Sequence, residues 1–214
     1  MATSPSGALT PLQDAFVRAF QARAPGFFLT GGAVLAGFTL RHRTTDDLDL
    51  FTSDAAEMSR GDAAVRGAAA DVEAEVTVVQ ASPDFRRYVI ATRDHSIKVD
   101  VALDRAPQLE PKRLVDGVRM DSLGEVMANK LSALVGRQEL RDLVDVRALE
   151  LAGLRVEVHL AAAAQKDGGV TPAVLAWLLD TFPIAEPVPG GVAASDLRAY
   201  ASDLARRMRT IARP

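Results

Sequence analysis

The sequence contains no cysteine, which excludes disulfide bonds, thiolate zinc sites and cysteine nucleophiles. It also has no apolar run near the ~18 residues that a membrane-spanning helix requires. Residues 1–9 lack a basic stretch followed by an apolar core, so we expect no signal peptide. These absences favour a cytoplasmic protein with no membrane segment.

Two common catalytic motifs are also missing. No G-x-S-x-G sequence is present, so Ser-His-Asp hydrolysis has no support. The pair Gly31-Gly32 is not followed by G-K-[ST], which excludes a Walker A phosphate loop. The formal net charge of −3 gives no overall basic signature of a nucleic-acid-binding protein, although a local basic patch remains open.

The first part of the chain predicts helices and strands in mixed order. Thr10-Pro11 predicts the start of a helix, because threonine caps well and proline suits the first turn. The apolar run Phe27-Phe28-Leu29 suits a buried strand, and an alternating pattern predicts a second strand over 47–51. Further elements are expected as a helix over 55–74, strands over 75–80, 87–92 and 96–103, and a short strand or a hairpin over 114–120.

The second part of the chain predicts helices almost throughout. Ser122 and Glu125 form a capping-box pattern ahead of an apolar run that ends near Val135, with Gly136 as a stop. Further helices are expected over 140–152, 156–166 and 171–180, and from Ser195 onward. We therefore expect an α+β protein, with a small mixed β-sheet and flanking helices over residues 1–121 and a mainly helical domain over 122–214.

Acidic side chains gather on the predicted strands. Asp47 and Asp49 share one strand face, whereas Asp46 has the opposite parity and is interpreted as a turn residue. Asp100 is a third carboxylate on a strand. Carboxylates that share a face repel each other and are best tolerated around a divalent cation, so we predict a Mg²⁺ or Mn²⁺ site at these three residues. The alternative is that Asp-Leu-Asp only ends a strand at a turn.

The order of these features resembles the nucleotidyltransferase superfamily related to DNA polymerase beta. An apolar strand, Gly31-Gly32, a spacer and D-x-D follow one another, and GGAVLAG followed by HRTTDDLDLF is most similar to the AbiEii/AbiGii toxin branch. KLSALVGR, which begins at Lys130, and RDLVD, which begins at Arg141, resemble two further motifs of that branch. The resemblance spans residues 27–152 and implies a metal-dependent nucleotidyltransferase core.

The resemblance also implies roles for individual residues. Lys130 and Arg137 are seven residues apart, two helical turns, so they point the same way and could hold a triphosphate. Asp145 either orients one of these cations or acts as a base; alternatively, Asp142 and Asp145 pair with Arg141 and Arg147 on a solvated helix face. The expected catalytic residues are Asp47, Asp49, Asp100, Lys130 and Asp145. The expected nucleotide-binding residues are Gly31, Gly32, Arg43, Thr44, Thr45, Lys130, Arg137 and Arg141.

By the same resemblance the protein is a toxin-like component with a partner antitoxin, which moves an NMP from an NTP to an acceptor hydroxyl, as some relatives do on tRNA. Two rival functions remain: transfer to a small molecule or a protein, and a degenerate fold that only binds. The intact carboxylates and Lys130 argue against the second.

The arginines near the C-terminus are interpreted as the polar face of an amphipathic helix, with an RNA phosphate contact as the alternative: Arg206, Arg207, Arg209 and Arg213.

Overall fold

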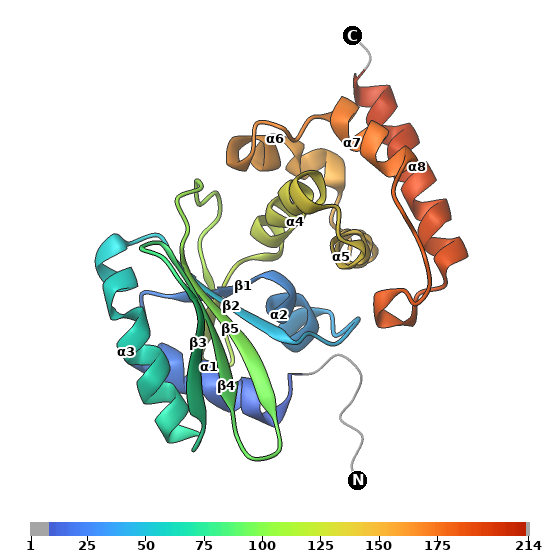
Figure 1. Ribbon diagram of the computed structural model, residues 1–214. Coiled ribbons are helices and arrows are strands. Elements are labelled where there is room, and N and C mark those ends of the chain that lie inside the picture. The colour runs from blue at the N-terminus through green and yellow to red at the C-terminus, as the bar shows by residue number, and fades with distance from the viewer. Residues whose placement is uncertain (1–8, 213–214) are drawn as a thin grey trace. The chain divides into compact units, whose positions relative to one another are not determined.

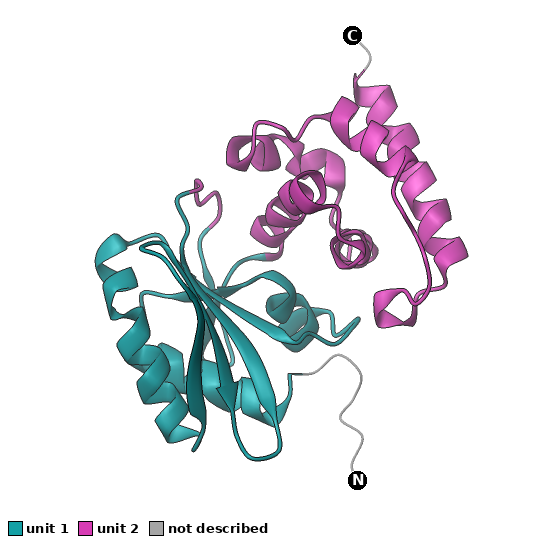
Figure 2. Ribbon diagram, in the orientation of Figure 1, with its two compact units in different colours: residues 1–105, 111–122 teal, residues 106–110, 123–214 magenta. Residues whose placement is uncertain are grey.

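The computed structural model describes residues 9–212, which form two compact units (Figure 1, Figure 2). The first unit contains the chain up to Arg105 together with Pro111–Ser122, and the second contains Ala106–Glu110 and the chain from Leu123 onward. We expected a single crossing after Asp121. The segment Ala106–Glu110 instead belongs to the second unit, so the chain passes between the units three times.

A seven-stranded mixed sheet forms the centre of the first unit. Its order is β3-β4-β5-β2-β1-β7-β6, in which β2 runs parallel to β5 and β1 runs parallel to β7, while the other neighbours are antiparallel. This confirms the expected α+β class with a small mixed sheet. The strands are β1 (Phe28–Thr30), β2 (Asp47–Thr52), β3 (Glu75–Ala81), β4 (Phe85–Ala91), β5 (Ser96–Leu103), β6 (Arg113–Val115) and β7 (Val118–Met120).

Strand β2 has one apolar face and one acidic face, as the alternating pattern predicts. Leu48 and Leu50 are fully buried, whereas Asp47 and Asp49 on the other face are only partly buried. Helices α1 (Pro11–Arg23) and α3 (Ala55–Asp71) contact each other and pack against the sheet (Figure 1). A Cβ on Gly61 of α3 would come within 2.9 Å of Val101 Cγ1, so α3 lies on the apolar face.

Both helices begin with side-chain caps. Thr10 Oγ1 accepts a hydrogen bond from the Gln13 amide at 3.2 Å, and Gln13 Oε1 accepts one from the Thr10 amide at 2.8 Å. Asp54 caps α3 by accepting a hydrogen bond from the Ala56 amide at 2.7 Å. Each cap contributes about 1 kcal/mol. The predicted start of α1 is confirmed, while α3 ends at Asp71, before the expected position.

The segment between β1 and β2 is helical at first. It begins as α2 (Gly31–Ala33) and continues as a π-helix over Val34–Thr39. Thr39 Oγ1 donates to the Val34 carbonyl at 2.9 Å and so supports the last turn. The turns of the π-helix are wider than those of an α-helix.

Helices make up the second unit. They are α4 (Leu123–Arg137), α5 (Leu140–Leu151), α6 (Val156–Lys166), α7 (Pro172–Asp180) and α8 (Ala194–Ala212), with a short 3₁₀ turn at Pro189–Gly191. The predicted bounds of α6 are confirmed. Helix α4 passes through Gly136, which we expected to end it, and stops one residue later. A Cβ at Gly136 would meet nothing within 4 Å, so close packing does not require this glycine.

Glu125 of α4 is a buried ionic anchor in the second unit. Its Oε2 accepts hydrogen bonds from the amides of Leu109 and Glu110 at 3.0 and 2.9 Å. Its Oε1 lies 2.5 Å from Lys166 Nζ in α6, and both side chains are almost completely buried. Since desolvation of a charge costs several kcal/mol, such a carboxylate needs close partners. Glu125 therefore ties the segment Ala106–Glu110 to α4 and α6.

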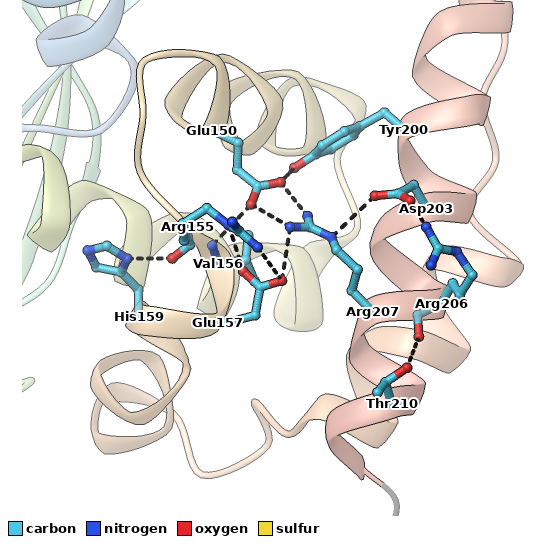
Figure 3. Close-up of polar contacts among 10 residues, drawn as sticks. All are labelled: Glu150, Arg155, Val156, Glu157, His159, Tyr200, Asp203, Arg206, Arg207 and Thr210. Carbon is cyan, nitrogen blue, oxygen red and sulfur yellow. Dashed lines mark hydrogen bonds and ion pairs between the residues drawn. The ribbon is translucent and has the colours of Figure 1, made fainter.

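The polar side of α8 is tied to α5 and α6 through Arg207 (Figure 3). Arg207 donates to Glu150 at 3.0 and 2.5 Å and to Glu157 at 2.9 Å. Tyr200 donates its hydroxyl to Glu150 at 2.8 Å. The opposite side of α8 is buried, which confirms that the helix is amphipathic. Two further arginines of the predicted polar face also have carboxylate partners: Arg206 pairs with Asp203, and Arg209 with Asp180.

None of the helices within residues 9–212 is long and apolar enough to cross a bilayer. Two expectations from the sequence concern residues outside that range. They are the absence of a signal peptide, which rests almost entirely on residues 1–8, and the role of Arg213.

Replacing Glu125 by alanine should destabilise the second unit, because Lys166 would lose its buried carboxylate. We expect the free energy of unfolding to fall by about 3–5 kcal/mol. The control is Asp180→Ala, which removes a partly exposed ion pair with Arg209 and should cost less than about 1 kcal/mol. Urea denaturation followed by circular dichroism measures both changes. Equal effects of the two substitutions would show that Glu125 is not an anchor.

Candidate active site

The acidic face of β2 adjoins the glycine pair that follows β1. Thr30 lies opposite Asp49 in the antiparallel register, so Gly31 comes next to the Asp49 side chain. Gly31 has a φ of +65°, a left-handed conformation that glycine adopts readily. A Cβ at this position would overlap the Asp49 carboxylate. Glycine is therefore required at position 31 for two reasons: its backbone conformation and the close approach of the Asp49 carboxylate.

Gly32 faces the basic loop that leads into β2. A Cβ on Gly32 would lie 2.6 Å from Arg43 Nη2 and 3.3 Å from Thr45 Oγ1. Arg43 is buried, and its Nη1 donates to the Thr44 carbonyl at 2.8 Å. Gln13 of α1 donates from Nε2 to the Thr45 carbonyl at 2.8 Å and so holds this loop. The structure thus brings together the five nucleotide-binding residues expected here: Gly31, Gly32, Arg43, Thr44 and Thr45.

The three expected metal ligands lie on neighbouring strands. Asp49 of β2 is the direct register partner of Asp100 on the parallel strand β5, so the two side chains share one face. Asp47 lies two residues earlier on β2 and shares that face. The register pairs Asp47 with Lys98, whose Nζ lies 3.9 Å from Asp47 Oδ1. The expectation that Asp47 and Asp49 lie on the same side of a strand is confirmed.

A guanidinium enters this carboxylate cluster. Arg87 of β4 donates from Nε to Asp100 Oδ1 at 2.8 Å and from Nη2 to Asp100 Oδ2 at 2.6 Å. The hydrogen bonds to Asp100 raise the pKa of Arg87 above its ordinary value, and the negative charges of Asp47 and Asp49 add to the increase. Arg87 therefore pairs with Asp100, and the charges of the other two carboxylates act on it over a longer range.

The donor set of the cluster suits a hard divalent cation, because such cations prefer carboxylate oxygens. Over the part of the chain that the structure describes, no three histidine, aspartate or glutamate side chains are arranged to hold a metal ion. Asp47, Asp49 and Asp100 carry oxygen ligands of the kind that Mg²⁺ and Mn²⁺ use, but in this structure they are not arranged around a common metal position, and Arg87 holds both oxygens of Asp100.

A second charged cluster lies in the second unit, where α4 contacts α5. Lys130 Nζ lies 2.8 Å from Asp142 Oδ1 and 2.6 Å from Asp145 Oδ2. Arg137 donates to Asp142 from Nε at 2.8 Å and from Nη2 at 2.9 Å. Lys130 and Arg137 therefore reach the same carboxylate, which confirms that they point the same way.

The two aspartates of the RDLVD segment are not on a solvated helix face. Asp142 and Asp145 are fully buried, so that alternative is wrong. Their three-residue spacing turns both toward α4, which supplies the cations. Burial raises the pKa of Asp142, but the hydrogen bond from Arg137 and the charge of Lys130 lower it more, and the net shift is downward.

Arg137 and Arg141 have greater access to solvent than Lys130. The side chain of Arg137 is 47% exposed and that of Arg141 is 39% exposed, against 5% for Lys130. Arg141 Nε lies 2.5 Å from Glu139 Oε2. An anionic ligand that approached this unit from solvent would therefore meet the two arginines before Lys130.

Comparison with known proteins agrees with this architecture. A family model described as the nucleotidyl transferase AbiEii toxin of type IV toxin–antitoxin systems matches residues 14–208. The chain belongs to the AbiEii family. It is a nucleotidyltransferase toxin by that membership, which confirms the resemblance seen in the sequence.

Two solved structures share the fold of this AbiEii-family protein. MenT4, a nucleotidyltransferase toxin from Mycobacterium tuberculosis, has a TM-score of 0.64 at 13% identity and covers 92% of this chain and 82% of its own. JHP933 from Helicobacter pylori has a TM-score of 0.59 at 20% identity and covers 94% of this chain and 90% of its own. At these identities the likeness shows the fold alone. No curated protein sequence matches the chain.

Three side chains in the clusters of this AbiEii-family protein were not assigned to them from the sequence: Gln13, Arg87 and Asp142. The signal for Arg87 lay in the hairpin, because a two-residue turn at Arg93-Asp94 carries Arg87 directly opposite Asp100. Strands were expected over 87–92 and 96–103, but no register was derived for them from the turn. The signal for Asp142 was its spacing from Asp145, whereas nothing local predicts the bond from Gln13 to Thr45.

Gly31→Ala should destabilise the first unit, because alanine is strained at φ +65° and its Cβ would overlap Asp49. We expect the free energy of unfolding to fall by about 1–3 kcal/mol. Gly136→Ala is the control, since its Cβ would meet nothing within 4 Å and helix propensity favours alanine by up to about 1 kcal/mol. Urea denaturation compares the two variants. A Gly31→Ala variant as stable as wild type would contradict the close approach of Asp49.

Asp142→Asn should weaken the second unit in a pH-dependent way. Because the pKa of Asp142 lies below its ordinary value of 3.8, the carboxylate stabilises the fold fully above pH 3.8 and less as the pH falls through the lowered pKa. We expect a loss of about 2 kcal/mol or more at neutral pH. Urea denaturation from neutral pH to below 3.8 measures the difference from wild type. A difference that disappears at mildly acidic pH would contradict the lowered pKa.

Proposed function

We propose that this AbiEii-family toxin transfers a nucleoside monophosphate from an NTP to an acceptor hydroxyl in a reaction that depends on Mg²⁺ or Mn²⁺. The observation that carries the proposal is the meeting of Gly31, Asp49 and Asp100 through the register of β1, β2 and β5. Phosphoryl-type transfer depends on positioning and charge stabilisation more than on covalent help from the protein. A glycine turn against adjacent carboxylates supports both requirements.

In this proposal Asp47, Asp49 and Asp100 hold the divalent cation, which when bound supplies charge stabilisation for the phosphates and the acceptor oxygen. The acceptor oxygen forms a bond to the α-phosphorus, the bond from that phosphorus to the bridging oxygen breaks, and pyrophosphate leaves. A carboxylate of the cluster accepts the hydroxyl proton. The atoms and charges of the reaction therefore balance without any further reactant.

The nucleotide phosphates are proposed to lie along the glycine pair and the loop that Gln13 holds. Gly31 and Gly32 permit a close approach to the backbone, because neither carries a side chain. Arg43 supplies a cation beside Gly32. Thr44 and Thr45 belong to the same loop and are proposed to line the phosphates with it.

Within the second unit, Lys130, Arg137 and Arg141 are proposed to bind phosphate oxygens. The exposed guanidinium groups of Arg137 and Arg141 support direct contact. Of the two roles expected for Asp145, we propose that it orients Lys130. Its full burial and its 2.6 Å distance from Lys130 Nζ support orientation better than proton abstraction.

RNA is the proposed acceptor, with tRNA first, because nucleotide addition to the acceptor end blocks aminoacylation and so suits a toxin. An antitoxin is the proposed protein partner, which follows from membership in a type IV toxin–antitoxin family. The cytoplasm is the proposed location, since it holds both NTP and tRNA.

The test is incubation of the purified protein with each α-labelled NTP, Mg²⁺ and total tRNA. We expect label on tRNA, and a decrease of about 100-fold or more in the transfer rate for Asp49→Ala. The matched control is Asp46→Asn, because Asp46 is an exposed carboxylate just before β2 and lies outside the cluster. It should transfer at nearly the wild-type rate.

Other outcomes change the proposal in defined ways. Label on a small molecule or on a protein, with the same loss in Asp49→Ala, would keep the site and replace the acceptor. Transfer that Asp49→Ala leaves unchanged would mean that the carboxylate cluster is not the active site. The absence of both transfer and metal-dependent NTP binding would favour a degenerate fold.

A further inference from the structure

Asp100 already has a cationic partner of its own. Arg87 holds both carboxylate oxygens, with 2.8 Å from Nε to Oδ1 and 2.6 Å from Nη2 to Oδ2. A bidentate pair between guanidinium and carboxylate combines charge with matched geometry and is a strong form of hydrogen bonding. The Asp100 side chain is only 11% exposed, whereas Arg87 is 44% exposed. The carboxylate is thus enclosed, and the guanidinium reaches solvent.

Strand alternation directs Arg87 into the cluster. Arg87 lies opposite Asp100 in the antiparallel β4–β5 register, and Asp47 and Asp49 raise its pKa in addition to Asp100. The preceding residue, Arg86, faces the other way. The hydrogen bond from Arg66 lowers the pKa of Asp62 in α3 most, and the charge of Arg86 adds to that decrease. Arg87 therefore lies on the side of the carboxylates, and Arg86 lies on the α3 side.

A guanidinium and a divalent cation compete for the same oxygens of Asp100. Like charges a few ångströms apart repel each other strongly in a partly buried site. Arg87 cannot relieve this repulsion by losing its proton, because arginine stays charged in proteins. A cation that uses Asp100 as a ligand must therefore displace the guanidinium from it.

We propose that Arg87 is a built-in competitor of the metal: it neutralises Asp100 in the metal-free protein and must release this carboxylate when a divalent cation binds. The inference rests on the proposed metal-dependent transfer. Arg87 is then a positioning residue, which holds Asp100 in place and sets the metal affinity of the cluster. Arg87 also contacts the Phe85 ring, since its guanidinium carbon lies 5.5 Å from the ring centroid. This contact does not depend on Asp100.

The experiment is a titration of the full chain with Mn²⁺ in the absence of nucleotide, in which electron paramagnetic resonance measures free Mn²⁺. The variants are Arg87→Ala and Arg87→Lys, since lysine keeps the charge but loses the bidentate geometry. Arg86→Ala is the matched control, because it removes one arginine from the same strand on the other face. Asp49→Asn tests whether any binding belongs to the cluster.

We expect Arg87→Ala to bind Mn²⁺ about threefold to tenfold more tightly than wild type, because the gain reflects the loss of one partly exposed ion pair. The Mn²⁺ affinity of Arg87→Lys should lie between those of wild type and Arg87→Ala, and the affinity of Arg86→Ala should match that of wild type. Asp49→Asn should bind more weakly. Circular dichroism confirms that each variant is folded, and Arg87→Lys serves alone if Arg87→Ala does not fold.

The failure of this inference and the failure of the proposed function give different Mn²⁺-binding results. If Mn²⁺ binds wild type in an Asp49-dependent way and neither Arg87 variant binds it more tightly, Arg87 is a sheet-stabilising residue and the inference is wrong. If no variant shows Asp49-dependent binding, the metal site itself is wrong and the inference falls with it. Binding that appears only in the Arg87 variants would support the competition most strongly.

Discussion

The first unit depends on the register in which β2 lies between β1 and β5. That register places Asp49 beside Gly31 on one side and beside Asp100 on the other. A shift of one residue would turn the aspartates toward α1 and α3 and bring Leu48 and Leu50 to the opposite face. The burial of these leucines therefore sets the position of the carboxylates. The same strand, β2, thus carries both the leucines that pack in the core and the aspartates of the candidate active site.

Buried charge sets the corresponding constraint in the second unit. Glu125, Asp142 and Asp145 are buried, and each has a cation within 2.8 Å. Removing one partner of such a pair costs more than the pair contributes, so these contacts specify which helices pack together. The aspartates bring α5 to α4, and Glu125 brings Ala106–Glu110 to α4 and α6. The residues that the family resemblance marks as functional are thus part of the packing of this unit.

Local patterns in the sequence predicted the elements and one face of the site, and long-range pairing explains the rest. The Thr10-Pro11 cap and the alternation over 47–51 act over a few residues, so they could be interpreted without a structure. The bond from Gln13 to Thr45, the pair of Arg87 with Asp100 and the return of Ala106–Glu110 to the second unit join distant segments. No periodicity encodes such partners. The β4–β5 turn is the exception, since its length fixes a register.

The central claim is that the β2–β5 carboxylates and the glycine pair form one nucleotide site. It is tested most directly by a crystal structure of the wild-type protein with Mn²⁺ and an NTP analogue whose α and β phosphates are joined by methylene. We expect an anomalous Mn²⁺ peak contacted by Asp47, Asp49 and Asp100, with phosphate oxygens against Gly31 and Gly32. A metal and triphosphate bound away from β2, with the Asp49 carboxylate still packed on Gly31 and Asp100 still held by Arg87, would contradict it.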